Sequence, residues 1–236
     1  MPVAQYYNVV YNETNYGDFM SRFSVETSLN NPAQPSTQQP GSSPVMPGNW
    51  PTVFNKETIG IERNGIIVNH DRPILSAADI QPIPWALEGI REMRLKGYRV
   101  VIFFNEPLIS EGRVTPDQVD TTNNRLMELF GQAGILSIDG LLYSTTSMKQ
   151  DIYSLPNNGM LKKAETDFRV KFKGGYFVGD KVYDLKAGDS VHATPVLIRS
   201  GQFADTLEKL DTFANKELKG KTKIYNNLLE FANQLP

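Results

Sequence analysis

The sequence predicts an α/β fold in which a parallel sheet of about five strands is flanked by helices. From Val53 onward, short apolar runs of strand length alternate with segments of helical periodicity, which is the order that builds βαβ units. A chain of 236 residues with 40% apolar content can bury one sizeable core. We therefore expect one main domain with an extension.

Short apolar runs bounded by turn residues are the candidate strands. They are expected at residues 58–61, 99–104, 140–143, 176–178 and 195–198. Because the segments between these runs carry helical patterns, the strands are expected to run parallel and to be connected by helices.

Helical spacing and capping residues place the helices between these strands. Residues 84–96 carry apolar side chains at near-helical spacing and close at Gly97, and a Thr-Pro-Asp sequence from Thr115 is typical of a helix start. Further helices are expected near 159–166, after Asp180, over 203–218 and over 226–234.

Residues 1–52 differ in composition from the rest of the chain. They are rich in Asn, Gln, Ser, Thr, Pro and Tyr, and are interpreted as an N-terminal arm followed by a Pro/Ser/Gln-rich linker, with residues 53–236 as the α/β domain. Aromatic side chains in the arm are expected to bind a partner chain. They are Tyr6, Tyr7, Tyr11, Phe19 and Phe23. The alternative is a leader without a partner.

Composition and charge exclude several classes of function. The formal net charge is −2, with 24 basic and 26 acidic residues and no block of like charge, so nucleic acid is not an expected partner. There is no cysteine, which excludes disulfides and thiolate chemistry. No apolar run is long enough to span a membrane and no signal peptide is visible, so we expect a soluble protein.

Polar residues follow three of the predicted strands. They occupy residues 62–66, 105–107 and 179–184. Ligands of open α/β sheets bind outside the carboxyl ends of the strands, so these segments are the candidate site. The only histidines, His70 and His192, are interpreted as loop or core residues.

Four short segments carry a family resemblance. They are Ile-Glu-Arg-Asn-Gly at 61–65, Phe-Asn at 104–105, Gly-Met-Leu at 159–161 and Val-Gly-Asp-Lys-Val-Tyr-Asp at 178–184. In order and spacing they resemble the haloacid dehalogenase superfamily, most closely its histidinol-phosphate and heptose-bisphosphate phosphatase branch. The resemblance covers about residues 57–201 and implies a haloacid dehalogenase-like Rossmannoid fold.

The resemblance also implies that catalytic positions are replaced. In that family one Asp attacks phosphorus and a second, two residues on, moves protons; the matching residues here are Glu62 and Asn64. A Thr or Ser that binds phosphate is matched by Phe104, followed by Asn105. No catalytic residue is therefore expected, and these four positions are interpreted as degenerate.

Two further features of the branch have no clear counterpart. Its phosphate-stabilising Lys falls near Leu155, although Lys149 or Lys162 could reach in from a shifted loop. The Cys/His zinc loop of the branch is matched by residues 144–148, which contain no such ligands.

The metal-ligand positions are the part of the family pattern that this sequence keeps. Asp180 and Asp184 follow Gly179 as in the family, and Glu62 supplies a third carboxylate, so a weak Mg²⁺ site is left open although no other cofactor is expected. The competing interpretation is that both Asp residues cap the following helix and bind loop amides.

Three hypotheses for function follow. The favoured one is a non-catalytic pseudo-phosphatase that serves as a structural or accessory subunit, attached through its arm to a virion, a ribosome-like particle or the periphery of a membrane complex. The alternative is a Mg²⁺-dependent phosphatase of a small phosphorylated metabolite that uses Glu62 or Asp180. A third is a module that binds a phosphorylated ligand without turnover, against which Phe104 argues because it has no donor.

Overall fold

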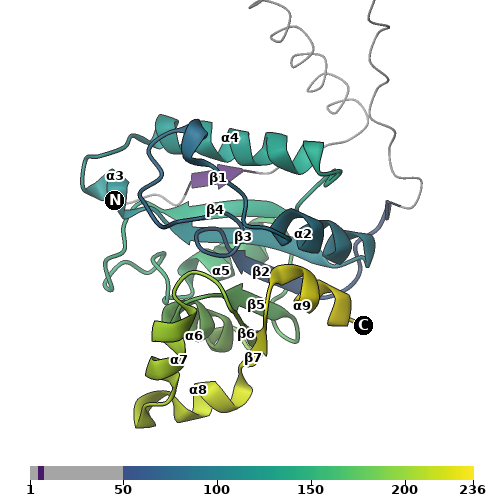
Figure 1. The fold of residues 1–236 in the computed structure, drawn as a ribbon, viewed down its shortest axis with the longest axis vertical. Coiled ribbons are helices and arrows are strands. Elements are labelled where there is room, and N and C mark those ends of the chain that lie inside the picture. Colours follow the sequence, from purple (N-terminus) through teal and green to yellow (C-terminus); the bar gives the residue numbers. More distant parts are fainter. Residues whose placement is uncertain (1–4, 8–49) are drawn as a thin grey trace, which may run out of the picture.

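A seven-stranded sheet in the order β1-β4-β3-β2-β5-β6-β7 forms the centre of the fold (Figure 1). The computed structural model describes residues 5–7 and 50–236. The strands are β1 Gln5–Tyr7, β2 Thr58–Glu62, β3 Arg99–Asn105, β4 Gly140–Ser144, β5 Tyr176–Gly179, β6 Thr194–Ile198 and β7 Lys223–Tyr225. Strands β2 to β7 pair in parallel, and β1 pairs antiparallel with β4. The predicted α/β fold is confirmed, and the five predicted strands correspond to β2–β6.

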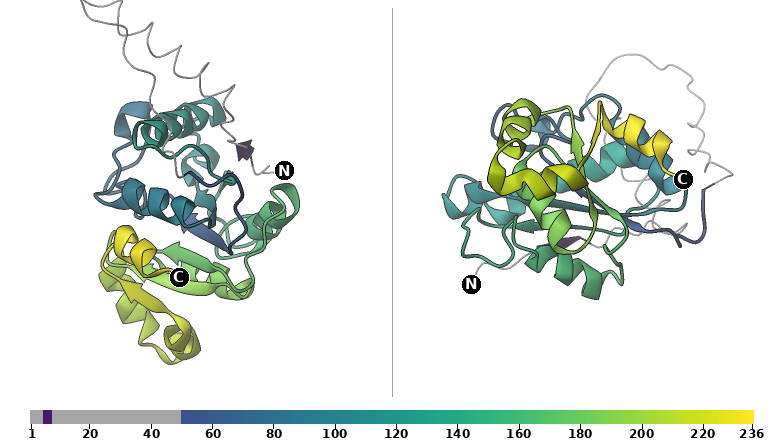
Figure 2. Two further views of the ribbon diagram at one scale, coloured as in Figure 1. Left: turned by 90° about the vertical axis from the view of Figure 1, so that its right-hand side faces the viewer. Right: turned by 90° about the horizontal axis from the view of Figure 1, so that it is seen from below.

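Helices cover both faces of the sheet, as two views of the molecule show (Figure 2). They are α2 Ala86–Leu95, α3 Pro107–Ser110, α4 Pro116–Gln132, α5 Gly159–Asp167, α6 Val182–Ser190, α7 Phe203–Leu210, α8 Lys216–Lys221 and α9 Leu228–Gln234, with 3-10 turns at Ala77–Asp79 and Phe213–Asn215. The predicted helix start at Thr115 is confirmed, because its side chain accepts the Gln118 amide and the Gln118 side chain accepts the Thr115 amide.

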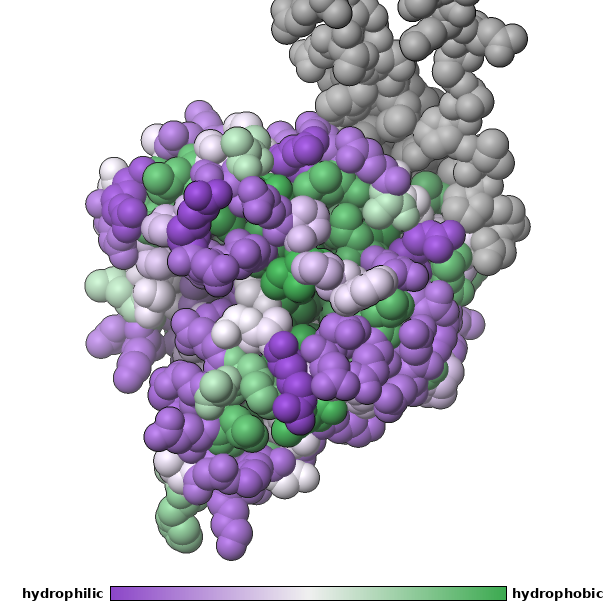
Figure 3. Space-filling model, in the orientation of Figure 1, coloured by the Kyte–Doolittle hydropathy of each residue, from purple (hydrophilic) through white to green (hydrophobic). Residues whose placement is uncertain are grey.

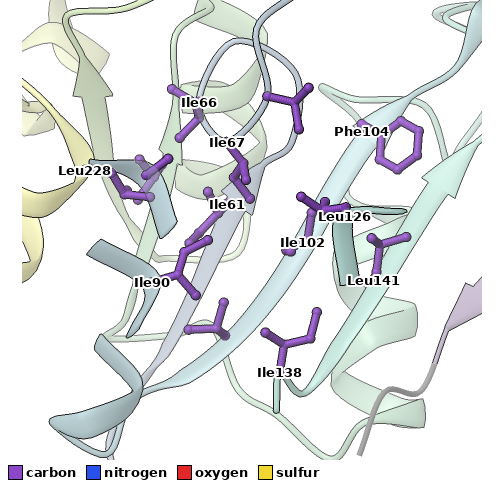
Figure 4. Close-up of a cluster of buried hydrophobic side chains, with 14 of the residues drawn as sticks. Ile61, Ile66, Ile67, Ile90, Ile102, Phe104, Leu126, Ile138, Leu141 and Leu228 are labelled. Carbon is purple, nitrogen blue, oxygen red and sulfur yellow. The ribbon is translucent and has the colours of Figure 1, made fainter. Parts of the chain in front are cut away.

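Alternation along the strands divides the interior into two layers. On β3, Ile102 and Phe104 pack in the cluster with α2, α4 and α9, whereas Phe103 packs in the cluster with α5. Figure 4 shows the first cluster, in which Ile90 of α2 and Leu228 of α9 lie beside Ile61 of β2. Polar residues cover most of the face seen in Figure 3, with smaller apolar patches between them.

The single helix predicted over 203–218 is wrong. The structure has α7, a 3-10 turn and α8 in its place, and Phe213, predicted to lie on the apolar face, is 95% exposed. Thr212 is extended, and the Asn215 side chain donates to the carbonyl of Lys209 at 2.9 Å. A side chain that satisfies a helix-end carbonyl stabilises a helix end, which the apolar spacing did not indicate.

The N-terminal arm is described only at residues 5–7. Tyr6 and Tyr7, predicted to contact a partner chain, lie in β1, whose backbone pairs with β4 of their own chain. Tyr11, Phe19 and Phe23 lie outside the described residues, as does most of the predicted linker. Within the described residues, no helix is long and apolar enough to span a membrane.

Candidate active site

Three neighbouring strands bring the candidate residues to one edge of the sheet. Glu62 ends β2, Asn105 ends β3 and Asp180 follows β5, and these strands lie in the order β3-β2-β5. Glu62 and Asn105 line one cavity, and Asp180 lines a second one, while Lys181 lines both. The expectation that the three polar segments meet at the carboxyl edge is confirmed.

Glu62 is a buried carboxyl group, and one of its oxygens makes no hydrogen bond to the described residues. The residue is 2% exposed, and its Oε2 has no hydrogen-bond partner within the described part of the chain. Burial, followed by the nearby charge of Asp184, holds the pKa of Glu62 well above its usual range, against the opposing charge of Lys181. A buried oxygen without a partner is costly, which points to a ligand at this position.

Asp180 and Lys181 form a buried ion pair beside Glu62. Nζ of Lys181 lies 2.8 Å from Oδ1 of Asp180 and 3.3 Å from the backbone carbonyl oxygen of Asn64. Burial alone would lower the pKa of Lys181, but the surrounding carboxylates, Glu62 first, outweigh it and raise that pKa. The other oxygen of Asp180 accepts the backbone amide of Gln202 at 2.8 Å, so this carboxylate is fixed from both sides.

Asp184 caps helix α6, as the capping interpretation expected. Its Oδ2 accepts the backbone amides of Lys181 at 3.1 Å and of Asp180 at 3.3 Å, whereas its Oδ1 has no partner among the described residues. Burial raises the pKa of Asp184 to about 7, against the opposing charge of Lys181. Asp184 therefore orders the loop that carries Asp180 and Lys181.

The chemistry of these donors fits a divalent cation. Glu62, Asp180 and Asp184 are three acidic side chains close enough to Lys181 to raise its pKa, and Glu62 and Asp184 each have an oxygen without a partner in the described part of the chain. Hard oxygen donors with excess negative charge suit Mg²⁺. Among residues 50–236, however, no three His, Cys, Asp or Glu side chains are arranged to hold a metal ion by themselves. Glu62, Asp180 and the carbonyl of Asn64 are the donors that would hold one.

Phe104 lies in the core and not in the cavity. Its ring stacks on Tyr143 with centroids 5.1 Å apart, and the guanidinium of Arg63 lies over the ring at 3.3 Å from its centroid. The residue is fully buried. Phe104 therefore contributes no group to the cavity, because strand alternation points this side chain into the helical layer.

Asn105 holds the loop that forms one wall of the cavity. Its Oδ1 accepts the backbone amide of Leu155 at 3.0 Å, and its Nδ2 donates to the Leu155 carbonyl at 3.1 Å. Leu155 and Pro156 line the cavity. The side-chain amide of Asn105 thus bonds to both backbone groups of Leu155, as a paired strand would. Asn105 therefore holds this segment in position, which its place in the sequence did not indicate.

Four lysines are among the residues that line the cavity, which has a volume of about 590 Å³. Those in the lining are Lys149, Lys181, Lys186 and Lys209. Lys149 was one of two candidates for a cation near Leu155, and the other, Lys162, does not line the cavity. His70 was interpreted as a loop or core residue, but it lies in the lining with Glu62 and Asn64. Burial lowers its pKa, as do the charges of Lys181 and Arg63.

Comparison with known proteins finds relatives that are named as phosphatases. No protein-family model matches the chain. A D-glycero-β-D-manno-heptose-1,7-bisphosphate 7-phosphatase of Pseudomonas aeruginosa is 28% identical over 185 residues, which cover 77% of this chain and 99% of the relative. A D-glycero-D-manno-heptose-1,7-bisphosphate 7-phosphatase of Chlorobaculum tepidum is 28% identical over 162 residues, covering 62% of this chain and 80% of the relative.

Solved structures agree with the sequence relatives. The D,D-heptose 1,7-bisphosphate phosphatase of B. bronchiseptica, solved with magnesium and phosphate, has a TM-score of 0.68 at 19% identity and covers 76% of this chain and 97% of its own. The chain has the fold of the haloacid dehalogenase phosphatases. A second D,D-heptose 1,7-bisphosphate phosphatase with this fold, from Burkholderia Thailandensis, has a TM-score of 0.55 at 20% identity, over 75% of this chain and 97% of its own.

The relatives overturn the expectation of a non-catalytic structural subunit. Proteins that match this haloacid dehalogenase-like chain over nearly their whole length carry the names of phosphatases, and an unrelated structural role does not account for that. The inference from Glu62 and Asn64 to a pseudo-enzyme was wrong because it judged each position by residue type alone. The comparisons favour the alternative, an enzyme.

Proposed function

We propose that the protein is a Mg²⁺-dependent phosphatase that acts on a small phosphorylated sugar. The observation that carries the proposal is the Oε2 of Glu62, which has no partner among the described residues and belongs to a buried residue in the lining of a cavity that four lysines also line. A carboxylate beside a cationic cavity is suited to attack a phosphoryl group that the lysines hold.

Glu62 is proposed as the attacking group. Its carboxylate oxygen forms a bond to phosphorus while the bond from phosphorus to the sugar oxygen breaks, which leaves an acyl phosphate on Glu62. Water then attacks this phosphorus, releases inorganic phosphate and regenerates the carboxylate. A bound Mg²⁺ would supply positive charge that keeps the carboxylates ionised and offsets charge on the phosphoryl oxygens.

His70 is proposed to move the protons. Asn64 has no titratable proton to exchange, and among the described residues that line the cavity His70 is the one whose usual pKa lies nearest neutrality. The His70 imidazolium gives its proton to the departing sugar oxygen, and the neutral ring takes a proton from the attacking water in the second step. The proton count is thus restored at the end of each cycle.

The cavity lining favours a substrate with two anionic groups. Lys181 lies close to Glu62, where the reacting phosphoryl group would bind, and Lys149, Lys186 and Lys209 also line this cavity. A sugar bisphosphate brings two phosphate groups with which these lysines can pair. The bisphosphate named for the bacterial relatives, a heptose 1,7-bisphosphate, is therefore the first substrate to test.

The test is release of inorganic phosphate by the full-length chain from a panel of sugar monophosphates and bisphosphates with Mg²⁺. We expect turnover on the order of 1 s⁻¹ with the best bisphosphate, loss of that turnover in Glu62→Gln, and loss on chelation of the metal. Glu208→Gln changes an exposed carboxyl on α7 and serves as the matched control. Phosphate release that is equal in Glu62→Gln and wild type, or absent with every substrate, would contradict the proposal.

A further inference from the structure

The ammonium group of Lys181 contacts two protein oxygens. Nζ contacts Oδ1 of Asp180 at 2.8 Å and the carbonyl oxygen of Asn64 at 3.3 Å. The side chains of Lys181 and Asp180 are 11% and 1% exposed. An ammonium group that leaves water is stable only where protein oxygens replace its hydration. Lys181 is therefore bound at this site as an internal cation.

The oxygens that hold Lys181 are also those that a divalent cation would use. A carboxylate and a backbone carbonyl are hard oxygen donors of the kind that bind Mg²⁺. Glu62, a buried carboxyl group close to Lys181, supplies a third. Two cations at one set of oxygens repel each other strongly at a few ångströms in a buried site. The ammonium of Lys181 and a divalent cation therefore exclude each other from these donors.

The charge balance favours exchange of one cation for the other. Three acidic side chains, those of Glu62, Asp180 and Asp184, act electrostatically on the ammonium group of Lys181, and Asp180 is in direct contact with it. Arg63, a second cation close to Glu62, is already engaged by other side chains, which are those of Asn64, Glu106 and Asn123. A divalent cation would bring twice the positive charge of the ammonium group to these acidic side chains.

We propose that Lys181 is a competing internal cation, which holds the site in the absence of metal and sets how tightly a divalent cation binds. Metal binding displaces the ammonium into the adjoining cavity, which Lys181 also lines and where an anionic substrate can pair with it. The inference deepens the proposed phosphatase function and rests on it only for the identity of the metal.

Isothermal titration of the full-length chain with Mg²⁺, without substrate, tests the competition. Lys181→Met removes the ammonium and keeps an unbranched side chain, whereas Lys186→Met removes an exposed lysine of α6 that also lines the cavity. We expect Lys181→Met to lower the Kd for Mg²⁺ about tenfold or more, and Lys186→Met to change it by less than about threefold. Equal or weaker binding by Lys181→Met, or the same gain in Lys186→Met, would overturn the proposal.

Thermal unfolding provides a second measurement, the Tm with and without Mg²⁺, which remains informative if the variant is less stable than wild type. In a chelator, Lys181→Met should have a lower Tm than wild type, because the carboxylate of Asp180 loses the counter-ion that contacts it. Mg²⁺ should raise the Tm of the variant more than that of wild type. Lys181→Gln should behave in the same way. If Mg²⁺ restores neither variant, the ammonium does not occupy a metal position. Since no substrate is used, absence of phosphate release would count against the proposed function alone.

Discussion

The guanidinium of Arg63 lies 3.3 Å from the centre of the Phe104 ring, where the end of β2 meets the helical layer. Arg63 is fully buried, and it donates to Asn123 at 2.7 Å and to Glu106 at 3.4 Å. It also donates to the side chain of Asn64 at 2.9 Å, which fixes the residue whose carbonyl faces Lys181. Phe104 thus supports the site by stacking under Arg63.

Replacement of Arg63 should therefore destabilise the whole strand end. Arg63→Met leaves Glu106 buried without its cation, and we expect the free energy of unfolding to fall by about 3–5 kcal/mol in urea denaturation. Arg113→Met is the control, because Arg113 pairs with Glu111 at a half-exposed position and should cost less than about 1 kcal/mol. Similar losses of unfolding free energy in both variants would mean that Arg63 contributes no more to stability than a surface ion pair does.

Gly65 leaves room for the carboxylate of Asp180, because any side chain at this position would collide with it. A Cβ at Gly65 would lie 2.5 Å from Oδ2 of Asp180, and the backbone there has a φ of +90°. Gly174 has a φ of +85°, but a Cβ there would meet no atom within 4 Å, so Gly174→Ala carries similar backbone strain without a clash. We expect Gly65→Ala to lower kcat/KM for phosphate release at least about tenfold, and Gly174→Ala to leave it nearly unchanged. Equal kinetic effects would show that backbone strain alone is responsible.

Asp184 should make the metal-free protein less stable as the pH rises. Its pKa in the folded chain is about 7, above its usual value of 3.8, so folding favours the protonated form. This contribution to stability is complete below about pH 4 and is lost as the pH rises through about 7, with each pKa unit equivalent to about 1.4 kcal/mol at most. Denaturation in a chelator from about pH 4 to 8 should show this fall in wild type and in Asp211→Asn, an exposed control, but a smaller one in Asp184→Asn.

His70 should account for one limb of the pH profile of turnover. Because its pKa lies below the usual 6.5, the imidazolium that protonates the leaving oxygen is depleted as the pH rises, and kcat should fall on that side. His70→Asn should lower kcat about a hundredfold and remove this limb. His192→Asn, at the other histidine, should change neither quantity. A pH profile of His70→Asn that matches wild type would assign the proton transfer to another group.

The sequence was sufficient to predict the fold because strands and turns are local signals. The apolar runs that come directly before Glu62, Asn105 and Gly179 were recognisable, and the carboxyl ends of parallel strands meet at one edge whatever the connecting segments do. The break in the helix predicted over 203–218 was missed because it depends on how the side chain of Asn215 bonds to Lys209.

The site was only partly predictable, because long-range contacts decide what each polar residue does. Asn105 bonds to Leu155, which is 50 residues away, and nothing near Asn105 in the sequence indicates this. Lys186 and Lys209 belong to different helices and meet in the cavity lining only in the folded chain. Residue type at Glu62 and Asn64 suggested lost catalysis, whereas the burial and the free oxygen of Glu62 are visible only in the described three-dimensional structure.

Transfer of a phosphoryl group to Glu62 is the central claim, and its direct measurement is mass spectrometry of acid-quenched protein during turnover of a sugar bisphosphate with Mg²⁺. Acid preserves an acyl phosphate long enough for peptides to be analysed. We predict a phosphoryl group on the peptide that contains Glu62 in wild type, and none on the same peptide of Glu62→Gln. Phosphate release without an adduct on Glu62, or with the adduct on another residue such as Asp180, would contradict the account.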